Sequence, residues 1–172
     1  MFISAHDRCY TAIGYRMPTN HGGKHMKRVS IKEEACIGCG LCQVYCIVEH
    51  STSRDPIKAY RREQPQPLSR VRVETNKPHS ISIRCQQCKD TPCVIACLSG
   101  AMSIDKETGL VVHDAEKCIG CWTCIMVCPY GAIKPDIANK IIAKCDLCPN
   151  LEVPACVANC PNEALVCEEV NQ

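Results

Sequence analysis

Sixteen of the eighteen cysteines fall into four groups whose spacing suits the ligands of an inorganic cluster. Each group begins with two cysteines separated by two residues and ends with two cysteines separated by three residues. Two groups have the complete C-x2-C-x2-C-x3-C run by which bacterial proteins bind [4Fe–4S] clusters, and the other two lengthen its middle spacing. The groups are Cys36, Cys39, Cys42 and Cys46; Cys85, Cys88, Cys93 and Cys97; Cys118, Cys121, Cys124 and Cys128; and Cys145, Cys148, Cys156 and Cys160. The sequence therefore predicts four [4Fe–4S] clusters held by these sixteen thiolates.

The spacing within each group predicts how its cysteines divide between clusters. Three cysteines in a tight loop can surround one cluster, and Gly38 and Gly120 should let the backbone approach it without an intervening Cβ atom. The fourth cysteine follows about one helical turn later, so we expect it to project from the start of a helix toward a different cluster. Because each motif then serves two clusters, the motifs should work in pairs. Pro129 and Pro161, directly after the last cysteines of two groups, should turn the chain away from the cluster.

Two other uses of closely spaced cysteines fit this chain less well. Zinc sites also use pairs of cysteines separated by two residues, but they usually stop at four ligands. Disulfide scaffolds belong to oxidising compartments, whereas this N-terminal stretch lacks the sustained apolar run of a signal peptide. Without its cysteines the chain is only about 35% apolar, so clusters rather than side chains should fill much of the interior. With no apolar run long enough to cross a bilayer, we expect a soluble, cytoplasmic protein.

The chain around the motifs repeats a short structural unit. CLSGAM (97–102), CPYGAI (128–133) and CPNEAL (160–165) share an alanine and an apolar residue at the same positions. Polar turns flanked by apolar residues predict hairpins at 102–113 and 133–144. The predicted fold class is α+β, with two ferredoxin-like dicluster modules of short helices and small antiparallel hairpins built around four clusters.

These motifs, together with CIGCW (118–122) and CDLCP (145–149), resemble those of the four-cluster ferredoxin-like electron-transfer subunits of multi-subunit oxidoreductases, over residues 27–168. Within that family the chain looks closest to the subunits that serve carbon monoxide dehydrogenases, tungsten aldehyde oxidoreductases, formate dehydrogenases and hydrogenases. The resemblance implies a non-catalytic partner of such a tungsten, molybdenum or nickel enzyme, often beside an FAD-containing NAD oxidoreductase, in anaerobic metabolism.

The resemblance also implies that the first motif pairs with the fourth and the second with the third. The implied ligand sets are Cys36, Cys39, Cys42 and Cys160; Cys145, Cys148, Cys156 and Cys46; Cys85, Cys88, Cys93 and Cys128; and Cys118, Cys121, Cys124 and Cys97. Module A would then combine the motifs at 36–46 and 145–160, and module B those at 85–97 and 118–128. Spacing alone leaves sequential pairing open, because 20 residues separate the second and third motifs and only 16 separate the third and fourth.

No feature of the sequence predicts substrate chemistry. Four cysteines per cluster leave no open coordination position, and neither a nucleophile with its base nor a GxGxxG or GKS/T nucleotide loop is recognisable. A body of about 147 residues has a radius of gyration near 15 Å, so four clusters inside it must lie close together. We therefore predict an electron relay between a catalytic subunit and a flavoprotein or another acceptor. A free polyferredoxin carrier and a redox-sensing iron-sulfur protein are the alternatives, and a relay with two open ends could also join copies of itself.

The longest segment between motifs, residues 47–84, predicts an irregular arm followed by a hairpin of VRVE (71–74) and SISI (80–83). It has eight Lys or Arg residues and four acidic residues, a net charge of about +4. Three uses of this charge stay open. It could offset the clusters, which each carry about −2 when oxidised, dock an acidic partner, or simply be solvated. Nucleic acid is not an expected partner, since only Tyr60 accompanies the basic residues.

Residues outside the motifs receive smaller roles. Trp122 should pack against a cluster and keep water out, with a contact at a partner interface as the alternative. Cys167 should be a small buried strand residue rather than a ligand. His50, His79 and His113 have no partner that spacing identifies, so we expect ordinary polar residues.

The first 26 residues, which include Cys9, have neither the repeat nor a clear periodicity. Gly22-Gly23-Lys24 could be encoded by a ribosome-binding sequence just before Met26. We therefore expect translation to start at Met26, and residues 1–26, if made, to be a poorly ordered N-terminal extension. The predicted four-cluster domain then spans residues 27–172.

Overall fold

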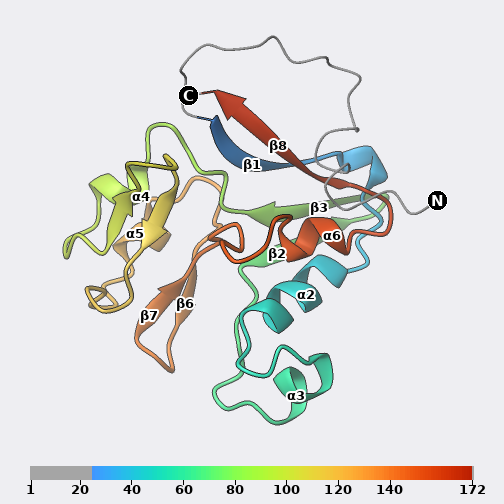
Figure 1. Ribbon diagram of the computed structural model, residues 1–172, viewed down its shortest axis with the longest axis horizontal. Helices are drawn as coiled ribbons and strands as arrows, with labels where there is room; N and C mark the ends of the chain where they lie inside the picture. The colour runs from blue at the N-terminus through green and yellow to red at the C-terminus, as the bar shows by residue number, and fades with distance from the viewer. Residues whose placement is uncertain (1–24, 172) are drawn as a thin grey trace.

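The computed structural model describes residues 25–171 (Figure 1). Short helices and strands alternate along this part of the chain. The elements are β1 (His25–Ile31), the 3-10 helix η1 (Glu33–Ala35), α2 (Leu41–Glu49), α3 (Pro56–Arg61), β2 (Val71–Asn76), β3 (His79–Arg84), α4 (Pro92–Ile95), β4 (Met102–Ile104), β5 (Val111–His113), α5 (Thr123–Met126), β6 (Lys134–Asp136), β7 (Ile141–Ala143), α6 (Ala155–Ala158) and β8 (Leu165–Asn171).

Residues 25–171 form four two-stranded antiparallel sheets. Three of them are local hairpins, which pair β2 with β3, β4 with β5 and β6 with β7. The fourth pairs β1 with β8, so that Met26 lies opposite Val170 and Ile31 opposite Leu165. Figure 1 shows this sheet bringing the two ends of the described chain together. Small antiparallel sheets with short helices confirm the predicted α+β class.

The hairpins occur where the sequence predicted them. β4 and β5 lie within 102–113, β6 and β7 lie within 133–144, and the strands around the TNKPH turn extend to 71–76 and 79–84. In each hairpin an apolar residue of a strand is buried, as with Val71, Val111 and Ile142. Alternation of apolar and polar residues around a polar turn was therefore a sufficient signal for these strands.

The prediction of an irregular arm after the first motif was wrong for part of its length. α2 continues to Glu49, and α3 forms over Pro56–Arg61. The carboxylate of Asp55 accepts a hydrogen bond of 2.8 Å from the backbone N–H of Lys58, and Pro56 occupies the first helical turn. An Asp followed by Pro is a common start of a helix, because the Asp side chain satisfies an open N–H group and Pro needs none.

Each of the four motifs starts a helix at the residue directly before its third cysteine. The helices α4, α5 and α6 have four residues each, so the fourth cysteine of their motifs lies just beyond the helix end. Only α2, with nine residues, includes its fourth cysteine, Cys46. The expectation that the fourth cysteine projects from a helix start was therefore wrong, since the third cysteine has that position. A single helical turn is unstable alone, so contacts with the rest of the fold must hold these helices.

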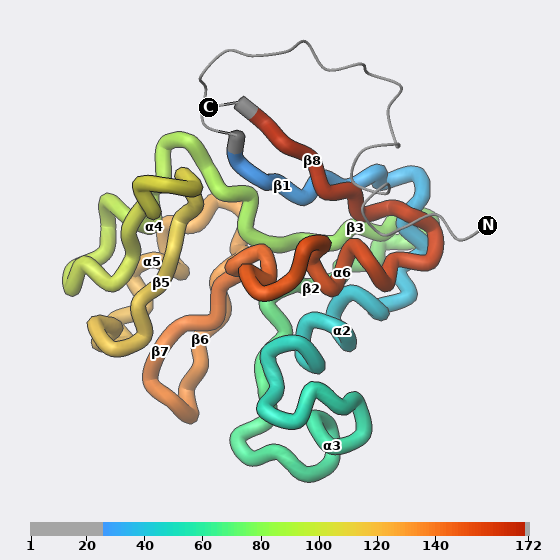
Figure 2. Tube along the Cα trace, in the orientation of Figure 1, coloured from blue at the N-terminus to red at the C-terminus, as the bar shows by residue number. Residues whose placement is uncertain are grey.

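Two separate apolar clusters make up the interior of the described chain. One contains Val29, Val71, Leu147 and Leu165 with the cysteines of α2 and α6. The other contains Met102, Val111, Ile133 and Ile142 with the cysteines of α4 and α5. Figure 2 shows α4 and α5 on one side of the molecule and α2 beside α6 on the other. Cysteine side chains thus contribute to both apolar clusters of the interior.

The predicted N-terminal extension lies mostly outside the described residues. Of its last two residues, His25 and Met26 both belong to β1, and the side chain of Met26 is 4% exposed. Within residues 25–171, none of the helices has the length and hydrophobicity that a membrane span requires.

Candidate metal centres

Four cavities in the structure are each lined by four motif cysteines. In every case three cysteines come from one motif and the fourth is the last cysteine of another motif. The first cavity has Cys36, Cys39, Cys42 and Cys160; the second has Cys85, Cys88, Cys93 and Cys128; the third has Cys97, Cys118, Cys121 and Cys124; and the fourth has Cys46, Cys145, Cys148 and Cys156. The structure thus brings all sixteen predicted site residues together, in the same sets that the family resemblance implied.

The four cavities are similar in size and composition. Their volumes, with the space at the mouth included, are about 350, 340, 300 and 340 Å³ in the order first to fourth. None of the sixteen cysteines takes part in a disulfide bond within the described chain. Four thiols around one cavity are the donor set that a [4Fe–4S] cluster needs.

The loop between the first two cysteines has the same backbone conformation in all four motifs. The residue directly before the second cysteine has a positive φ angle: 68° at Gly38, 49° at Gln87, 65° at Gly120 and 63° at Leu147. This left-handed conformation reverses the chain within two residues, so that both cysteines can face one cavity. Glycine adopts it without strain, which explains its use in two of the loops.

The space beside these two glycines is used differently from our prediction. A Cβ atom on Gly120 would lie 2.5 Å from the carbonyl oxygen of Lys140, and one on Gly38 would lie 2.7 Å from the hydroxyl of Ser80. In both cases the neighbouring atom belongs to a hairpin that packs against the loop. The missing side chain therefore makes room for a hairpin, rather than only for a cluster.

In three of the four motifs, the sulfur of the last cysteine accepts a hydrogen bond from a backbone N–H group. Cys46 accepts a hydrogen bond of 3.2 Å from Arg70, Cys97 one of 3.4 Å from Met102, and Cys128 one of 3.4 Å from Ala132. In each case the donor lies after the cysteine in the sequence, outside the loop between the first two cysteines of the motif. Hydrogen bonds of this kind stabilise the thiolate form of cysteine, which is the form that binds metal.

Burial makes seven of the sixteen cysteines that line the cavities unfavourable places for a bare thiolate. Burial raises the pKa of the Cys124 and Cys148 thiols to about 11, and it raises that of Cys145 to about 12. Losing the proton at neutral pH therefore requires a positive charge inside the cavity, and metal ions supply one. The residues present fit iron-sulfur clusters on this ground as well as by their number.

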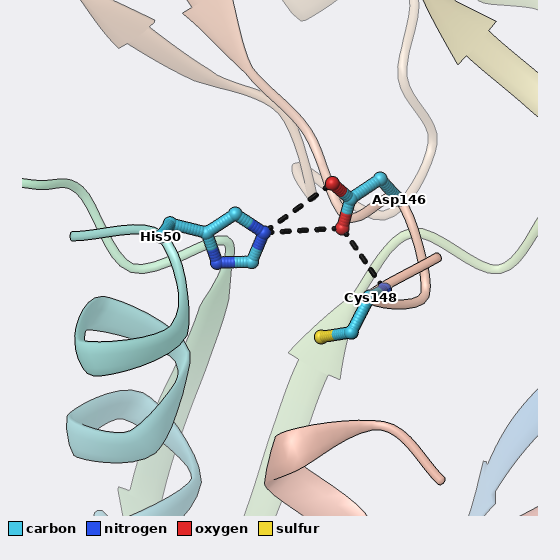
Figure 3. A group of neighbouring side chains, drawn as sticks. All are labelled: His50, Asp146 and Cys148. Atoms are coloured by element: carbon cyan, nitrogen blue, oxygen red, sulfur yellow. Dashed lines mark hydrogen bonds and ion pairs between the residues drawn. The ribbon is translucent and has the colours of Figure 1, made fainter. Parts of the chain in front are cut away.

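A polar network lies beside the fourth cavity, and Figure 3 shows three of its members, His50, Asp146 and Cys148. The Nε2 atom of His50 lies 3.1 Å from an oxygen of Asp146, and the same oxygen accepts a 3.1 Å hydrogen bond from the backbone N–H of Cys148. Arg70 forms an ion pair with the other oxygen of this carboxylate. His50 Nδ1 donates to the carbonyl oxygen of Cys46 at 2.7 Å and lies 3.7 Å from the sulfur of Cys46.

The network holds opposite charges together. Burial disfavours the charge of Asp146, but hydrogen bonding to His50 and the charge of Arg70 outweigh it, and the pKa of Asp146 lies well below its usual range. Burial likewise disfavours the charged form of His50, but its bonds to Asp146 and Cys46 raise its pKa to about 10. The expectation that His50 is an ordinary polar residue was therefore wrong, and no spacing pattern could have found a partner 96 positions away.

His50, Asp146 and Cys148 also lie close enough to hold a metal ion, with their ligand atoms within 4.8 Å of one another. Two contacts argue against that use. Both ring nitrogens of His50 donate hydrogen bonds, and Arg70 already neutralises the carboxylate. Cys148 in addition lines the fourth cavity with three other cysteines. The network supports the wall of that cavity and is not a fifth metal site.

Sequence reasoning did not predict the burial of two cations, Arg84 and Lys144, which are 1% and 5% exposed. Each directly precedes the first cysteine of a motif, and this position was the available signal. The signal is not sufficient by itself, because Lys117 has the same position before Cys118 but is exposed and ion-paired with Asp114 at 2.8 Å.

The other predicted residues have the following surroundings. Trp122 lines the third cavity and packs against the apolar cluster of α4 and α5. Cys167 lies in β8 and is 4% exposed, as expected for a small buried strand residue. The basic residues of the arm divide between roles, since Arg54 pairs with Glu49 at 3.5 Å while Arg70 and Arg84 line the fourth cavity.

Comparison with known proteins finds iron-sulfur and electron-transport relatives. A family model described as "4Fe-4S dicluster domain" matches residues 78–170. "Electron transport protein HydN" of Escherichia coli (strain K12) is 39% identical over 154 residues, which cover 80% of this chain and 85% of that protein. The "Aliphatic sulfonate oxidoreductase, polyferredoxin-like subunit" of Pyrococcus furiosus is 36% identical over 137 residues, which cover 77% of this chain and 70% of that protein.

One match among solved structures is a chain of the active site complex BamBC of benzoyl coenzyme A reductase, as isolated. The match has a TM-score of 0.48 and 19% sequence identity, and it covers 86% of this chain and 80% of that chain. The family model spans three of the four cysteine motifs, at 85–97, 118–128 and 145–160. HydN is aligned with four-fifths of the chain. The chain belongs to the 4Fe-4S dicluster domain family, as a ferredoxin-like electron-transfer protein whose cofactors are [4Fe–4S] clusters.

Proposed function

We propose that the chain is the non-catalytic electron-transfer subunit of an oxidoreductase complex, and that each of its four cavities holds one [4Fe–4S] cluster. A bound cluster of this kind accepts and donates one electron at a time. The observation that carries the proposal is the lining of each cavity by four cysteines from two motifs. In this proposal all sixteen motif cysteines are iron ligands, so the protein offers no open coordination position for substrate.

The positions of the cavities support a relay. The first and fourth cavities share α2, because Cys42 faces one and Cys46 the other. The second and third share the segments 93–97 and 124–128 in the same way. The thiol of Cys145 in the fourth cavity interacts electrostatically with that of Cys85 in the second. The cavities therefore follow one another in the order first, fourth, second, third.

The two cavities at the ends of this order are the more accessible ones. Cys39 of the first cavity and Cys121 of the third are the two exposed cysteines among the sixteen. A relay needs one end at which it receives electrons and another at which it delivers them. These exposed cysteines mark the two faces that we propose as docking sites for electron donor and acceptor.

The partners that we propose are a catalytic oxidoreductase subunit and a flavin- or NAD-binding subunit. The name of the Pyrococcus furiosus relative describes a polyferredoxin-like subunit of an oxidoreductase, which supports a catalytic partner. HydN is named only as an electron transport protein, which suits a free carrier equally well. Size-exclusion chromatography of extract from the native host separates these two functions, because a subunit elutes with a large partner and a carrier elutes alone.

Metal analysis of anaerobically purified protein tests the proposal directly. We expect about 16 iron atoms and about 16 acid-labile sulfides per chain, as four [4Fe–4S] clusters require. Replacing one cysteine of a cavity, as in Cys156→Ala, should remove or alter a single cluster. The matched control is Cys167→Ala, which changes a buried cysteine outside the motifs and should leave the iron content unchanged. Stoichiometric zinc, or a colourless preparation, would rule the proposal out.

A further inference from the structure

A buried cation without a carboxylate partner forms part of the wall of the fourth cavity. The side chain of Arg84 is 1% exposed and lines this cavity beside Cys145 and Cys156. Its guanidinium donates hydrogen bonds to the carbonyl oxygens of Val29 and, at 3.3 Å, Ser82. Within the described chain its Nε–H has no hydrogen-bond partner. All the acceptors of this buried cation are therefore neutral.

A buried guanidinium is costly unless a negative charge lies near it. Arginine does not lose its proton in proteins, so Arg84 stays charged although burial lowers its pKa. No carboxylate within residues 25–171 forms an ion pair with it. Its strongest favourable interactions are with the thiols of Cys156 and Cys145 in the fourth cavity and then with Cys42 in the first cavity. The counter-charge that the fold provides for Arg84 is therefore whatever negative charge these cysteines carry.

Lys144 is a second buried cation, and it directly precedes Cys145 of the fourth cavity in the sequence. It is 5% exposed, and its Nζ atom donates to the carbonyl oxygens of Val111 at 2.5 Å and Cys145 at 2.8 Å. Its charge interacts with the thiols of Cys145 in the fourth cavity and Cys93 in the second. Arg84 thus interacts with cysteines of the fourth and first cavities, and Lys144 with cysteines of the fourth and second.

Of the four cavities in the described chain, the fourth alone has Lys or Arg among its lining residues. The residues that line the first, second and third cavities include no Lys or Arg. In the fourth cavity Arg70 is ion-paired with Asp146, which leaves Arg84 as the guanidinium without a carboxylate. The positive charge inside the protein is therefore concentrated at the fourth cavity.

We infer that Arg84, with Lys144, raises the reduction potential of the cluster in the fourth cavity above the potentials of the clusters in the other three. The inference rests on the proposed function, since it requires a cluster in each cavity. Reduction adds one negative charge, and a fixed cation in a poorly solvated site stabilises that charge. Arg84 is thus not a ligand of the cluster, but its charge makes an inner position of the relay the preferred place for the electron.

The test is a redox titration of the holoprotein, followed by electron paramagnetic resonance, on three variants. Arg84→Met removes the charge and keeps much of the volume, whereas Arg84→Lys keeps the charge. Arg72→Met is the matched control, because Arg72 lies on the paired strand β2 but is 43% exposed and ion-paired with Glu74 at 2.6 Å. A Cys148→Ala variant should lose the signal of the cluster in the fourth cavity, and this loss identifies which signal belongs to that cavity.

We expect Arg84→Met to shift the reduction equilibrium of that signal at least tenfold toward the oxidised form, which is about 59 mV for one electron. Arg84→Lys and Arg72→Met should shift it much less. If Arg84→Met keeps all its iron and the potential stays unchanged, the inference is overturned. If Arg84→Met loses the cluster of the fourth cavity, Arg84→Lys decides between the two explanations. If Arg84→Lys retains that cluster, the charge of residue 84 has a role there. If both variants lose the cluster equally, the inference is overturned.

Iron content of the unaltered protein separates this inference from the proposed function. Fewer than four clusters per chain before any substitution would contradict the proposed function. A full complement of clusters, in which the signal of the fourth cavity has the lowest potential, would contradict the inference alone.

Discussion

Cys42 and Cys46 lie one turn apart on the same helix, α2, but face different cavities. Cys42 lines the first cavity with Cys36, and Cys46 lines the fourth cavity with Cys145. Residues four positions apart lie on one side of a helix, so the two cavities must be neighbours. The helix thereby fixes the distance between two metal sites with a single rigid element.

This relationship predicts that neighbouring substitutions affect different clusters. Cys42→Ala should remove or convert the cluster of the first cavity, and Cys46→Ala that of the fourth. Electron paramagnetic resonance of the reduced proteins should show the loss of two different signals. The same signal lost from both variants would contradict the crossing of the motifs.

Removing the iron should unfold much of the chain. The helices α4, α5 and α6 have four residues each and cannot persist without tertiary contacts. Burial raises the pKa values of many of the thiols, so the emptied cavities would hold neutral side chains without their metal partners. Chelation under reducing conditions should therefore remove most of the ellipticity in far-ultraviolet circular dichroism. An iron-free chain with an unchanged spectrum would show that the fold does not depend on metal.

The network around Asp146 should stabilise the fourth cavity. Asp146→Asn would leave the charges of Arg70 and His50 without a counter-charge, and we expect a loss of about 1–2 kcal/mol, roughly a tenfold faster loss of the cluster. The measurement is the rate at which the visible absorption bleaches in denaturant. Lys117→Ala is the control, since it breaks the exposed pair with Asp114 and should leave the rate unchanged. Equal rates for all three proteins would mean that the network has no structural role.

Two glycines beside the third cavity provide a test of backbone packing. Gly100 and Gly120 have φ angles of 67° and 65°, but a Cβ atom would meet no atom within 4 Å at Gly100 and would lie 2.5 Å from the Lys140 carbonyl oxygen at Gly120. Gly100→Ala should therefore cost only the left-handed strain of about 1–2 kcal/mol. Gly120→Ala should cost about 1–3 kcal/mol more, because the β6–β7 turn must shift.

Unfolding rates of the two iron-loaded variants in guanidinium compare these costs. The Gly120 variant should unfold faster and should lose the cluster of the third cavity first. Indistinguishable rates would show that the hairpin adjusts without cost.

The parts of the structure that depend on local spacing could be predicted from the sequence. Hairpins follow from alternation over a few residues, and the division of sixteen cysteines into four motifs follows from their spacing. Which motifs share a cavity was implied only by the family resemblance, because spacing left sequential pairing open. The start of α3 was also readable, because Asp55 and Pro56 form a recognisable helix start that we did not use.

The parts that depend on tertiary packing could not be predicted. Asp146 reaches His50 only because α2 and the fourth motif pack together. Arg84 and Lys117 stand in the same position before a CxxC motif, but Arg84 is buried while Lys117 is exposed. What differs is the burial that the surrounding fold imposes, and a sequence pattern does not contain it.

The pairing of β1 with β8 brings the two ends of the described chain together, as the first and fourth cavities also do. The first and fourth cavities combine cysteines at 36–46 with cysteines at 145–160, whereas the second and third are complete within 85–128. Iron uptake by ribosome-bound nascent chains of increasing length would reveal the resulting order of maturation. The second and third cavities can be completed while the ribosome is still translating, whereas the fourth must wait until Cys156, and the first until Cys160, has left the exit tunnel.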